Sequence, residues 1–339
     1  MPHSHLSEQQ LFDKFASFPR PRYPFPDMVS PAMEELVQEY YGWIEQDYQF
    51  HTPQARERHK SHRLSDFAAR TMPHLSLAEL RPLARYASTG AMMDDYYDRT
   101  GTDDWATIRA RIMALLTGEA DRDPGPGIEH QFFMMRQDAL AIDMPARLHQ
   151  RYIAALNEVL VGYQDEKRWV AANQPPPLPV YFSVREPTSG VIPFAYYVAM
   201  QKDFRELPDD VLDHWVMRRL RQLSARMVGM HNDLISLPKE LARDGDVINI
   251  VMCIQRDQHL SIEDAYHRSL ALHDSYLEQF QVLHQNLPDF GRWQALADDY
   301  VLHLGIMVQG LLTYHLTTTR YQPDSYVEPE YHSTTFTWT

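Results

Sequence analysis

Residues 231–240 read His-Asn-Asp-Leu-Ile-Ser-Leu-Pro-Lys-Glu, and within them Asn232, Ser236 and Glu240 recur at every fourth position. Because an α-helix has about 3.6 residues per turn, these side chains would project from one helix face. The stretch therefore predicts a helix that carries a row of oxygens. Such oxygens suit a hard divalent cation such as Mg2+. The same residue types also occur on ordinary solvated faces, so the row alone leaves both interpretations open.

A second acidic segment lies far upstream, where residues 94–98 read Asp-Asp-Tyr-Tyr-Asp after an apolar run. On a helix Asp94 and Asp98 share a face, and their like charges repel each other, more strongly where they are partly buried. Metal ions would neutralise them. Substrate phosphates could then bridge ions held on two facing helices. The two segments together indicate a two-walled site for metal and phosphate.

This pair of segments resembles the motif pair of the class I terpene synthases, an aspartate-rich DDxxD motif followed by an NDxxSxxKE motif. The second motif is matched at every specified position, by Asn232, Asp233, Ser236, Lys239 and Glu240. Arg185 is placed like the diphosphate-sensing arginine of that family, and Arg320-Tyr321 resembles its terminal RY pair. These marks occur in the family's order between residues 94 and 321, which makes the resemblance specific.

The resemblance implies an all-α, single-domain bundle around a central active-site cavity, and a cyclase that depends on Mg2+, in a cluster of about three ions. It implies that the metal ligands are Asp94, Asp98, Asn232, Ser236 and Glu240. It implies that the diphosphate is bound by Arg185, Asn232, Lys239, Arg320 and Tyr321. Arg185 and Tyr321 would also act in catalysis. By position, Thr188 and Ser189 would be the linker and effector residues, although the family more often has glycine at the effector position. Asp95 is expected to pair with Arg320 when the site closes.

The resemblance also indicates the substrate class. Single-domain members of this size are mostly sesquiterpene synthases, so the expected partner is an isoprenyl diphosphate, first of all farnesyl diphosphate. The product would be a cyclic hydrocarbon or alcohol. Geranylgeranyl diphosphate is the alternative, because nothing in the motifs measures chain length. A homodimer is possible on the same grounds.

Composition narrows the remaining function classes. A formal net charge of −14 argues against a nucleic-acid partner, because binding a polyanion requires a basic face. We find neither a run of about 18 apolar residues nor the layout of a secretory signal, so no membrane span is expected. The single cysteine, Cys253, ends a mostly apolar run and is predicted to be buried and structural. These features fit a reducing cytoplasm.

Apolar residues recur at three and four along most of the chain, and no alternating strand pattern interrupts them. This predicts an all-α fold, with one domain over residues 1–339 and no shift in composition that would mark a second one. Long helices are expected at about 33–44, 80–97, 148–163, 211–240, 260–287 and 293–318. Residues 1–31 are proline-rich and are expected to form an irregular strap, either a lid or a loose tail. Residues 322–339 have no period and would order only with substrate.

Three local features lead to predictions of their own. Residues 185–190 contain Pro187 and Gly190, which predict a break in the helix beside Arg185. Pro238 should kink the helix that carries Glu240. Tyr314 stands where many family members have a tryptophan on the pocket floor, and it would line the pocket here.

Residues 209–213, Asp-Asp-Val-Leu-Asp, form a literal second DDxxD motif. Paired DDxxD motifs are typical of an isoprenyl diphosphate synthase. Proline at the boundary and acids in the first turn instead indicate a helix start, which is the interpretation we favour. A helical scaffold without activity would require the whole motif set to be a coincidence.

Overall fold

A computed structural model describes residues 7–50, 52–97, 102–242 and 246–322, with the backbone alone at 94–97, 102 and 103. Throughout these described residues the regular elements are helices and none is a strand. The predicted all-α fold is confirmed.

The helices follow in chain order, and the six long helices expected from the sequence correspond to α2, α5, α8, α12, α14 and α15. Their bounds are α1 Glu8–Ala16, α2 Met33–Gln46, α3 Pro53–Ser61, α4 Asp66–Thr71, α5 Leu77–Tyr97, α6 Thr102–Thr117, α7 Ile128–Ala141, α8 Ala146–Ala172, α9 Leu178–Thr188, α10 Ile192–Tyr197, α11 Asp209–Leu212, α12 Trp215–Leu241, α13 Ile250–Gln258, α14 Ile262–Gln285 and α15 Gln294–Thr317, with short 3₁₀ turns η1 Val198–Met200, η2 Lys202–Glu206, η3 Gly291–Trp293 and η4 Thr319–Tyr321.

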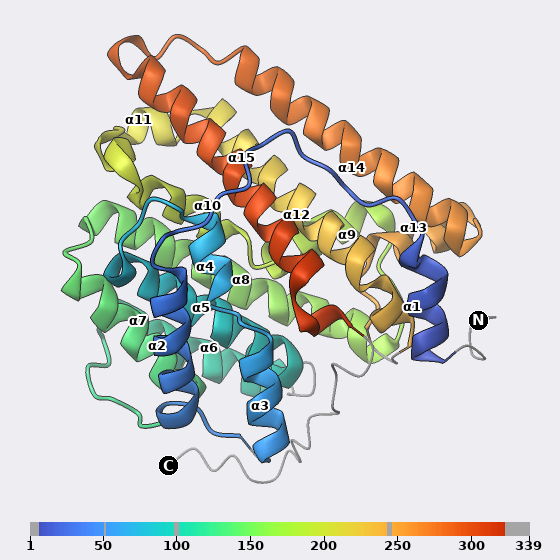
Figure 1. Ribbon diagram of the computed structural model, residues 1–339, viewed down its shortest axis with the longest axis horizontal. Coiled ribbons are helices and arrows are strands. Elements are labelled where there is room, and N and C mark those ends of the chain that lie inside the picture. Colours follow the sequence, from blue (N-terminus) through green and yellow to red (C-terminus); the bar gives the residue numbers. More distant parts are fainter. Residues whose placement is uncertain (1–6, 51, 98–101, 243–245, 323–339) are drawn as a thin grey trace.

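Helix α12 is the central element of the bundle. It packs against α14 and α15 on one side and against α9, α10 and α13 on others, while α5 packs against α2, α4 and α7 (Figure 1). Helix α8 packs against α9 and α10, which also contact α12, and on its other side against α6. Burying a leucine such as Leu234 or Leu237 of α12 completely stabilises the fold by about 1.5–3 kcal/mol each.

Helix α12 begins at Trp215, later than the predicted 211, because the acids at 209 and 210 start the separate short helix α11. The His214 side chain accepts a hydrogen bond from the backbone N–H of Val216 and so caps the new start. Cys253 of α13 is fully buried, which confirms the prediction of a buried cysteine, and burial raises the pKa of its thiol.

The N-terminal strap is ordered along the outside of the bundle. Residues 8–16 form the helix α1 with a capping box at Ser7, so the prediction of an irregular strap was wrong for this part. Residues 17–31 then cross α14, α12 and α15 on the way to α2 (Figure 1). Tyr266 of α14 donates a hydrogen bond to the Pro19 carbonyl at 3.0 Å. Phe25 lies against Gly305 of α15, where an added Cβ would come within 2.5 Å of the ring.

Helix α15 is the most apolar of the long helices, and many of its side chains lie in the hydrophobic core. Among the described residues, the stretch Gly291–Thr317 is long and apolar enough to cross a membrane by length and composition alone. However, 67% of its most apolar window is buried inside the protein, which is what a core helix shows.

Candidate active site

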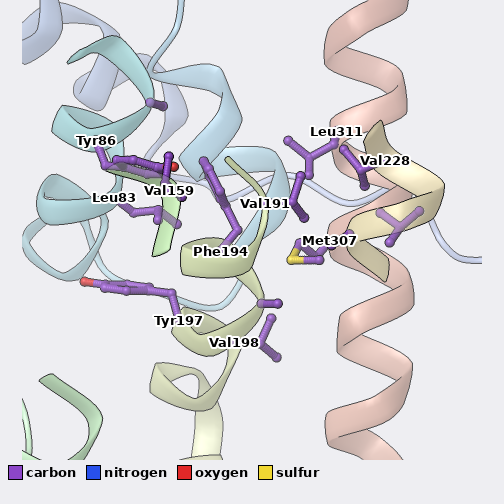
Figure 2. Packing of buried hydrophobic residues seen from close by; sticks show 14 of the residues in the cluster. Leu83, Tyr86, Val159, Val191, Phe194, Tyr197, Val198, Val228, Met307 and Leu311 are labelled. Atoms are coloured by element: carbon purple, nitrogen blue, oxygen red, sulfur yellow. The ribbon is translucent and has the colours of Figure 1, made fainter. Parts of the chain in front are cut away.

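A cavity of about 130 Å³ lies between α5, α9, α10, α12 and α15. Its apolar wall includes Tyr86, Val191, Phe194, Val228 and Leu311, which Figure 2 shows gathered from these helices. Its other lining residues are Leu64, Phe67, Ala87, Gly90, Ala91, Tyr163, Arg185, Thr188, Ser189, Gly190, Gly229, Asn232, His315, Arg320 and Tyr321. The cavity therefore combines aromatic and aliphatic walls with a set of polar groups that includes two arginines.

The predicted row of oxygens lies on α12, with Ser236 buried and Asn232 and Glu240 partly buried. The Ser236 hydroxyl lies 2.5 Å from Glu240 Oε1 and 2.9 Å from the Asn232 carbonyl oxygen. Burial and the neighbouring Asp233 raise the pKa of Glu240. The structure thus confirms that these side chains share a helix face and that two of the three are in contact.

Asn249, for which the sequence predicted no role, fixes the row of oxygens on α12 from the start of α13. Its amide nitrogen donates to Glu240 Oε2 at 2.7 Å and to the Asp233 carbonyl at 2.8 Å. Its amide oxygen accepts from the backbone N–H of Val251 and so caps α13. The signal in the sequence was an asparagine inside an apolar run. Such a run is expected to be buried, as Asn249 is, and a buried amide requires hydrogen-bond partners.

Asp233, the second residue of the motif, anchors the site and does not point to a metal. Its fully buried carboxylate accepts from Tyr181 at 2.6 Å, from the backbone N–H of Ile250 at 2.7 Å and from Arg185 Nε at 2.9 Å. Burial by itself lowers the pKa of Arg185, but the Asp233 carboxylate outweighs it and raises that pKa. Arg185 is therefore a permanent cation fixed at one end of the cavity.

Arg185, Asn232 and Tyr321 meet in one hydrogen-bonded group. Arg185 Nη2 donates to Asn232 Oδ1 at 2.7 Å, and Asn232 Nδ2 donates to the Tyr321 hydroxyl at 2.8 Å. Arg320 precedes Tyr321 on η4 and also lines the cavity. The structure brings together four of the residues predicted to bind diphosphate.

Lys239, the fifth residue of that set, is buried in the last turn of α12 and does not line the cavity. The structure therefore places it apart from the other predicted diphosphate ligands. Its role in diphosphate binding stays a prediction from the resemblance.

The acidic segment at residues 94–98 lies largely outside the part of the chain that the structure describes. Asp94 is on the last turn of α5, but its side chain, like that of Asp95, is not described. Asp98 lies wholly outside the described part of the chain. The predicted metal ligation by Asp94 and Asp98, and the pairing of Asp95 with Arg320, stay predictions.

The helix break near Arg185 occurs, but later than predicted. Helix α9 continues through Pro187 to Thr188, and the chain turns at Ser189 and Gly190, whose φ of +70° suits glycine. Tyr86 donates to the Gly190 carbonyl at 2.9 Å. Thr188 and Ser189 both line the cavity, and the Thr188 hydroxyl is buried with no hydrogen-bond partner among the described residues.

Two glycines allow this turn to approach its neighbours. A Cβ at Gly162 of α8 would come within 2.8 Å of Pro187, and one at Gly229 of α12 would touch Ser189 and Arg185 at ordinary contact distance. Close packing on both sides therefore sets the position of the turn relative to α12.

Pro238 does not end α12, which continues to Leu241. Proline cannot donate the helical hydrogen bond to the Leu234 carbonyl. Arg20 of the strap donates to that carbonyl instead, at 3.2 Å. The strap therefore supplies the hydrogen bond that Pro238 cannot make, close to Lys239 and Glu240. No feature of the sequence predicted this contact.

The prediction that Tyr314 lines the cavity was wrong. Its side chain is buried against Phe67, with ring centroids 3.9 Å apart, and its hydroxyl donates to the His62 carbonyl at 2.7 Å. Phe67 and His315 occupy the cavity wall there. A tyrosine hydroxyl needs a partner when it is buried, and the available carbonyl lies on the far side.

Residues 209–213 are engaged in ion pairs on the surface. Asp209 and Asp210 are in the first turn of α11, as the helix-start interpretation predicted. Arg147 and Arg151 of α8 donate to Asp209 at 3.1 and 2.9 Å, and Arg151 also donates to Asp213 at 2.6 Å. Two arginines already neutralise Asp209 and Asp213, the first and last acids of the second DDxxD motif, which argues against a metal site there.

The residues of α12 fit a hard divalent cation. They offer an amide, a hydroxyl and a carboxylate oxygen on one face, and oxygen is the ligand type that Mg2+ prefers. Arg185 occupies one lone pair of Asn232 Oδ1, and an amide oxygen has a second one. Burial raises the pKa of Glu240 because it disfavours the charged carboxylate, and a bound cation would stabilise that charged form.

Comparison with known proteins agrees with this geometry. Residues 85–279 match the family described as terpene synthase family 2, C-terminal metal binding. The chain is 26% identical over 312 residues to a (+)-T-muurolol synthase of Roseiflexus castenholzii, covering 89% of this chain and 93% of that protein. It is 24% identical to a 10-epi-cubebol synthase of Sorangium cellulosum, covering 89% and 98%.

Solved structures of low sequence identity share the fold. The linalool/nerolidol synthase of Streptomyces clavuligerus aligns with a TM-score of 0.75 at 20% identity, over 87% of this chain and 99% of that one. A hedycaryol synthase in complex with nerolidol aligns with a TM-score of 0.71 at 21% identity, over 87% and 99%. The bundle is thus the class I terpenoid synthase fold. With the family matched over more than half of its length, this chain is an enzyme that belongs to terpene synthase family 2, a metal-binding family.

Proposed function

We propose that this chain is a Mg2+-dependent class I terpene cyclase that converts farnesyl diphosphate into a cyclic sesquiterpene hydrocarbon or alcohol and releases diphosphate. The observation that carries the proposal is the hydrogen-bonded group of Arg185, Asn232 and Tyr321 at one end of a largely apolar cavity. Such a cavity matches a substrate with an anionic head and a hydrocarbon tail.

The names of several relatives support this choice of substrate. The muurolol synthase of Roseiflexus castenholzii and a 7-epi-alpha-eudesmol synthase of Streptomyces viridochromogenes are both named as (2E,6E)-farnesyl diphosphate cyclizing. The second is 26% identical over 75% of this chain.

The charged end of the cavity would stabilise the leaving diphosphate. Arg185 is locked to Asp233 and offers planar, forked donors toward the cavity, and Arg320 adds a second cation. Fixed donors of this kind stabilise charge as it develops, because they need no reorganisation during the reaction. Tyr321 would add a hydroxyl donor from the same end.

Mg2+, when bound, would supply Lewis-acid stabilisation of the diphosphate oxygens. Asn232, Ser236 and Glu240 would hold it on α12, with Asp94 and Asp98 as the proposed ligands from α5 and the segment after it. Asn249 would orient Glu240, and Asp233 would orient Arg185. In this role both act through another residue.

The remaining cavity wall would protect the carbocation that ionisation leaves behind. Tyr86, Phe194 and Phe67 present aromatic rings, whose faces attract a cation without reacting with it. The apolar wall also excludes water, which would otherwise quench the cation. The turn at Ser189 and Gly190 lies where the hydrocarbon and charged parts meet.

The test is to incubate the purified protein with Mg2+ and, separately, geranyl, farnesyl and geranylgeranyl diphosphate, and to analyse the extract by gas chromatography with mass spectrometry. A cyclic C15 product from farnesyl diphosphate is expected. A cyclic product from geranylgeranyl diphosphate alone would move the assignment to a diterpene cyclase. Only longer linear diphosphates, formed with added isopentenyl diphosphate, would indicate an isoprenyl diphosphate synthase.

A pair of variants, one on α12 and one on α11, tests which of the two helices carries the metal ligands. Asn232→Ala should lower kcat/KM by about 100-fold or more, because it removes a metal ligand and a partner of Arg185. Asp210→Asn should leave it unchanged, because Asp210 is exposed on α11. Equal losses from both variants would contradict the assignment of the metal wall to α12.

A further inference from the structure

A buried chain of hydrogen bonds joins the cavity to the protein surface. Asp274 Oδ1 lies 3.0 Å from His273 Nδ1, and His273 Nε2 lies 2.6 Å from the Tyr23 hydroxyl. The same hydroxyl lies 2.9 Å from His231 Nδ1. His231 Nε2 lies 2.9 Å from His315 Nδ1. His315 lines the cavity, and the side chain of Asp274 is 59% exposed.

This chain of bonds, which we call the histidine chain, crosses three helices and the strap. His273 is on α14, His231 on α12 and His315 on α15, while Tyr23 belongs to the strap. His231 and His273 are completely buried and His315 nearly so. Nothing in the proposed binding of diphosphate uses these groups.

The carboxylate at the outer end fixes the hydrogen positions along the histidine chain. With the Asp274 carboxylate oxygen accepting from His273 Nδ1, the other ring nitrogen, Nε2, accepts from the Tyr23 hydroxyl. The Tyr23 hydroxyl has one hydrogen, and the contact with His273 Nε2, at 2.6 Å, is much shorter than the one with the Met227 carbonyl, at 3.4 Å. The Tyr23 oxygen therefore accepts from His231 Nδ1, and His231 Nε2 accepts from His315 Nδ1. His315 is left with its hydrogen on Nδ1 and a lone pair on Nε2.

The free end of His315 belongs to the cavity. Among the described residues no donor or acceptor is bonded to its Nε2, and this atom is not among the fully buried atoms without a partner. Burial, together with Arg185 and Arg320, lowers the pKa of His315 to about 3. The His315 ring is therefore neutral at pH 7, and Nε2 has a lone pair available to accept a proton.

Within the described cavity wall no other residue carries a basic nitrogen lone pair. Arg185 and Arg320 are cations without an acceptor. The Tyr86 hydroxyl is engaged with the Gly190 carbonyl, and the Thr188 hydroxyl is a far weaker base than an imidazole.

We propose that His315 accepts the proton lost from the final carbocation in the cavity, and that the histidine chain positions it for this role. The inference rests on the cyclase activity proposed above. A proton leaves the carbon next to the cationic centre and binds His315 Nε2, and the electron pair of the broken C–H bond forms the new C=C bond. The His315 imidazolium keeps its Nδ1 hydrogen on His231 and returns the added proton from Nε2 to water when the product leaves the cavity. Tyr23, His231 and His273 are positioning residues.

The orientation of His315 can be measured without any turnover. Nitrogen-15 NMR of the protein labelled in its histidines distinguishes the two neutral tautomers, and the signals of His315 are those missing in His315→Gln. We expect His315 to be protonated on Nδ1. Tyr23→Phe should lower the population of this tautomer, because it removes the link between His273 and His231. Protonation of His315 on Nε2 in the wild type would overturn the proposal.

The chemical role is tested by comparing diphosphate release with product formation from farnesyl diphosphate. His315→Gln should keep diphosphate release within about threefold of the wild type but lower the yield of the main alkene by about 10-fold or more. Tyr23→Phe should shift the products in the same direction by a smaller factor. Tyr266→Phe is the matched control, since it also removes one hydrogen bond to the strap, at Pro19, yet lies outside the histidine chain.

The outcomes separate this inference from the proposed function. If the wild type forms a cyclic product and His315→Gln leaves the product ratio unchanged, the released diphosphate is the acceptor and the inference is wrong, while the proposed function stands. If Tyr266→Phe shifts the products as much as Tyr23→Phe, loosening of the strap explains the effect and positioning by the histidine chain is wrong. If the wild type turns over no prenyl diphosphate, the proposed function itself fails, and this inference fails with it.

Discussion

Two acidic segments lie close together in the chain and have opposite surroundings. Residues 209–213 match DDxxD letter for letter, yet their carboxylates are exposed, and those of Asp209 and Asp213 are bound by arginines of α8. Residues 232–240 contain fewer acids, but Asp233 is fully buried and Glu240 partly so. These two are held in place by Tyr181, Arg185 and Asn249.

The difference teaches that the supporting residues, more than the acid count, distinguish a site for metal and phosphate from a helix start. At the surface each carboxylate is solvated and screened, so its partners contribute little. In the buried segment every carboxylate needs partners fixed by the fold, and those partners orient the neighbouring groups. Removing a partner should therefore have a large effect at α12 and a small one at α11.

The largest effect is expected from Asp233→Asn. This change leaves the Arg185 guanidinium, which is only 16% exposed, without its carboxylate. Breaking a buried ion pair on one side costs about 3–5 kcal/mol of folding free energy. Urea unfolding should show this loss, whereas the matched variant Asp210→Asn on α11 should lose less than about 1 kcal/mol. Similar losses in both variants would remove the basis of the comparison.

A smaller effect is expected from Asn249→Ala. The change removes the amide that holds Glu240 Oε2, and partners of this kind alter metal affinity by about 10- to 100-fold when they are lost. The Mg2+ concentration needed for pyrophosphate to protect the protein against thermal unfolding should rise by that factor. Asn286→Ala, at the exposed end of α14, is the control and should leave it unchanged.

The sequence predicted the row on α12 because a fixed four-residue interval maps directly onto one helix face. It predicted the six long helices for the same reason, since their apolar residues recur at helical spacing. It did not show which groups Asn249 and Arg20 bind, because both act on α12 from segments that are distant along the chain or outside that helix. The resemblance placed Tyr314 in the cavity, at a position where many family members have a tryptophan. This was wrong because the tyrosine hydroxyl, unlike a tryptophan ring, bonds to the His62 carbonyl on the far side.

The strap offers a way to sharpen the comparison. Arg20 donates to the Leu234 carbonyl that Pro238 leaves free, so Arg20→Gln should cost about 1 kcal/mol of folding free energy, the value of one hydrogen bond. Arg22 lies in the same strap and is exposed, which makes Arg22→Gln the control. Hydrogen exchange should show faster opening of the last turn of α12 in Arg20→Gln alone. Unchanged exchange there would mean that water replaces the arginine without cost.

The smallest effect is expected from Asp213→Asn, and its pH dependence tests the surface side of the comparison. The hydrogen bond from Arg151 lowers the pKa of Asp213 below the value of about 3.9 expected in the unfolded chain. A depressed pKa stabilises the folded state above that value, and the contribution disappears as the pH falls through the folded-state pKa. Because the side chain is 47% exposed, solvent screening limits the loss at pH 7 to a few tenths of a kcal/mol, about the value of an exposed ion pair. Urea unfolding of the wild type and of Asp213→Asn should therefore differ slightly at pH 7 and converge as the pH falls below the lowered folded-state pKa of Asp213. A difference above about 2 kcal/mol at pH 7 would show that Asp213 behaves like the buried acid of α12, and the distinction between the two segments would no longer hold.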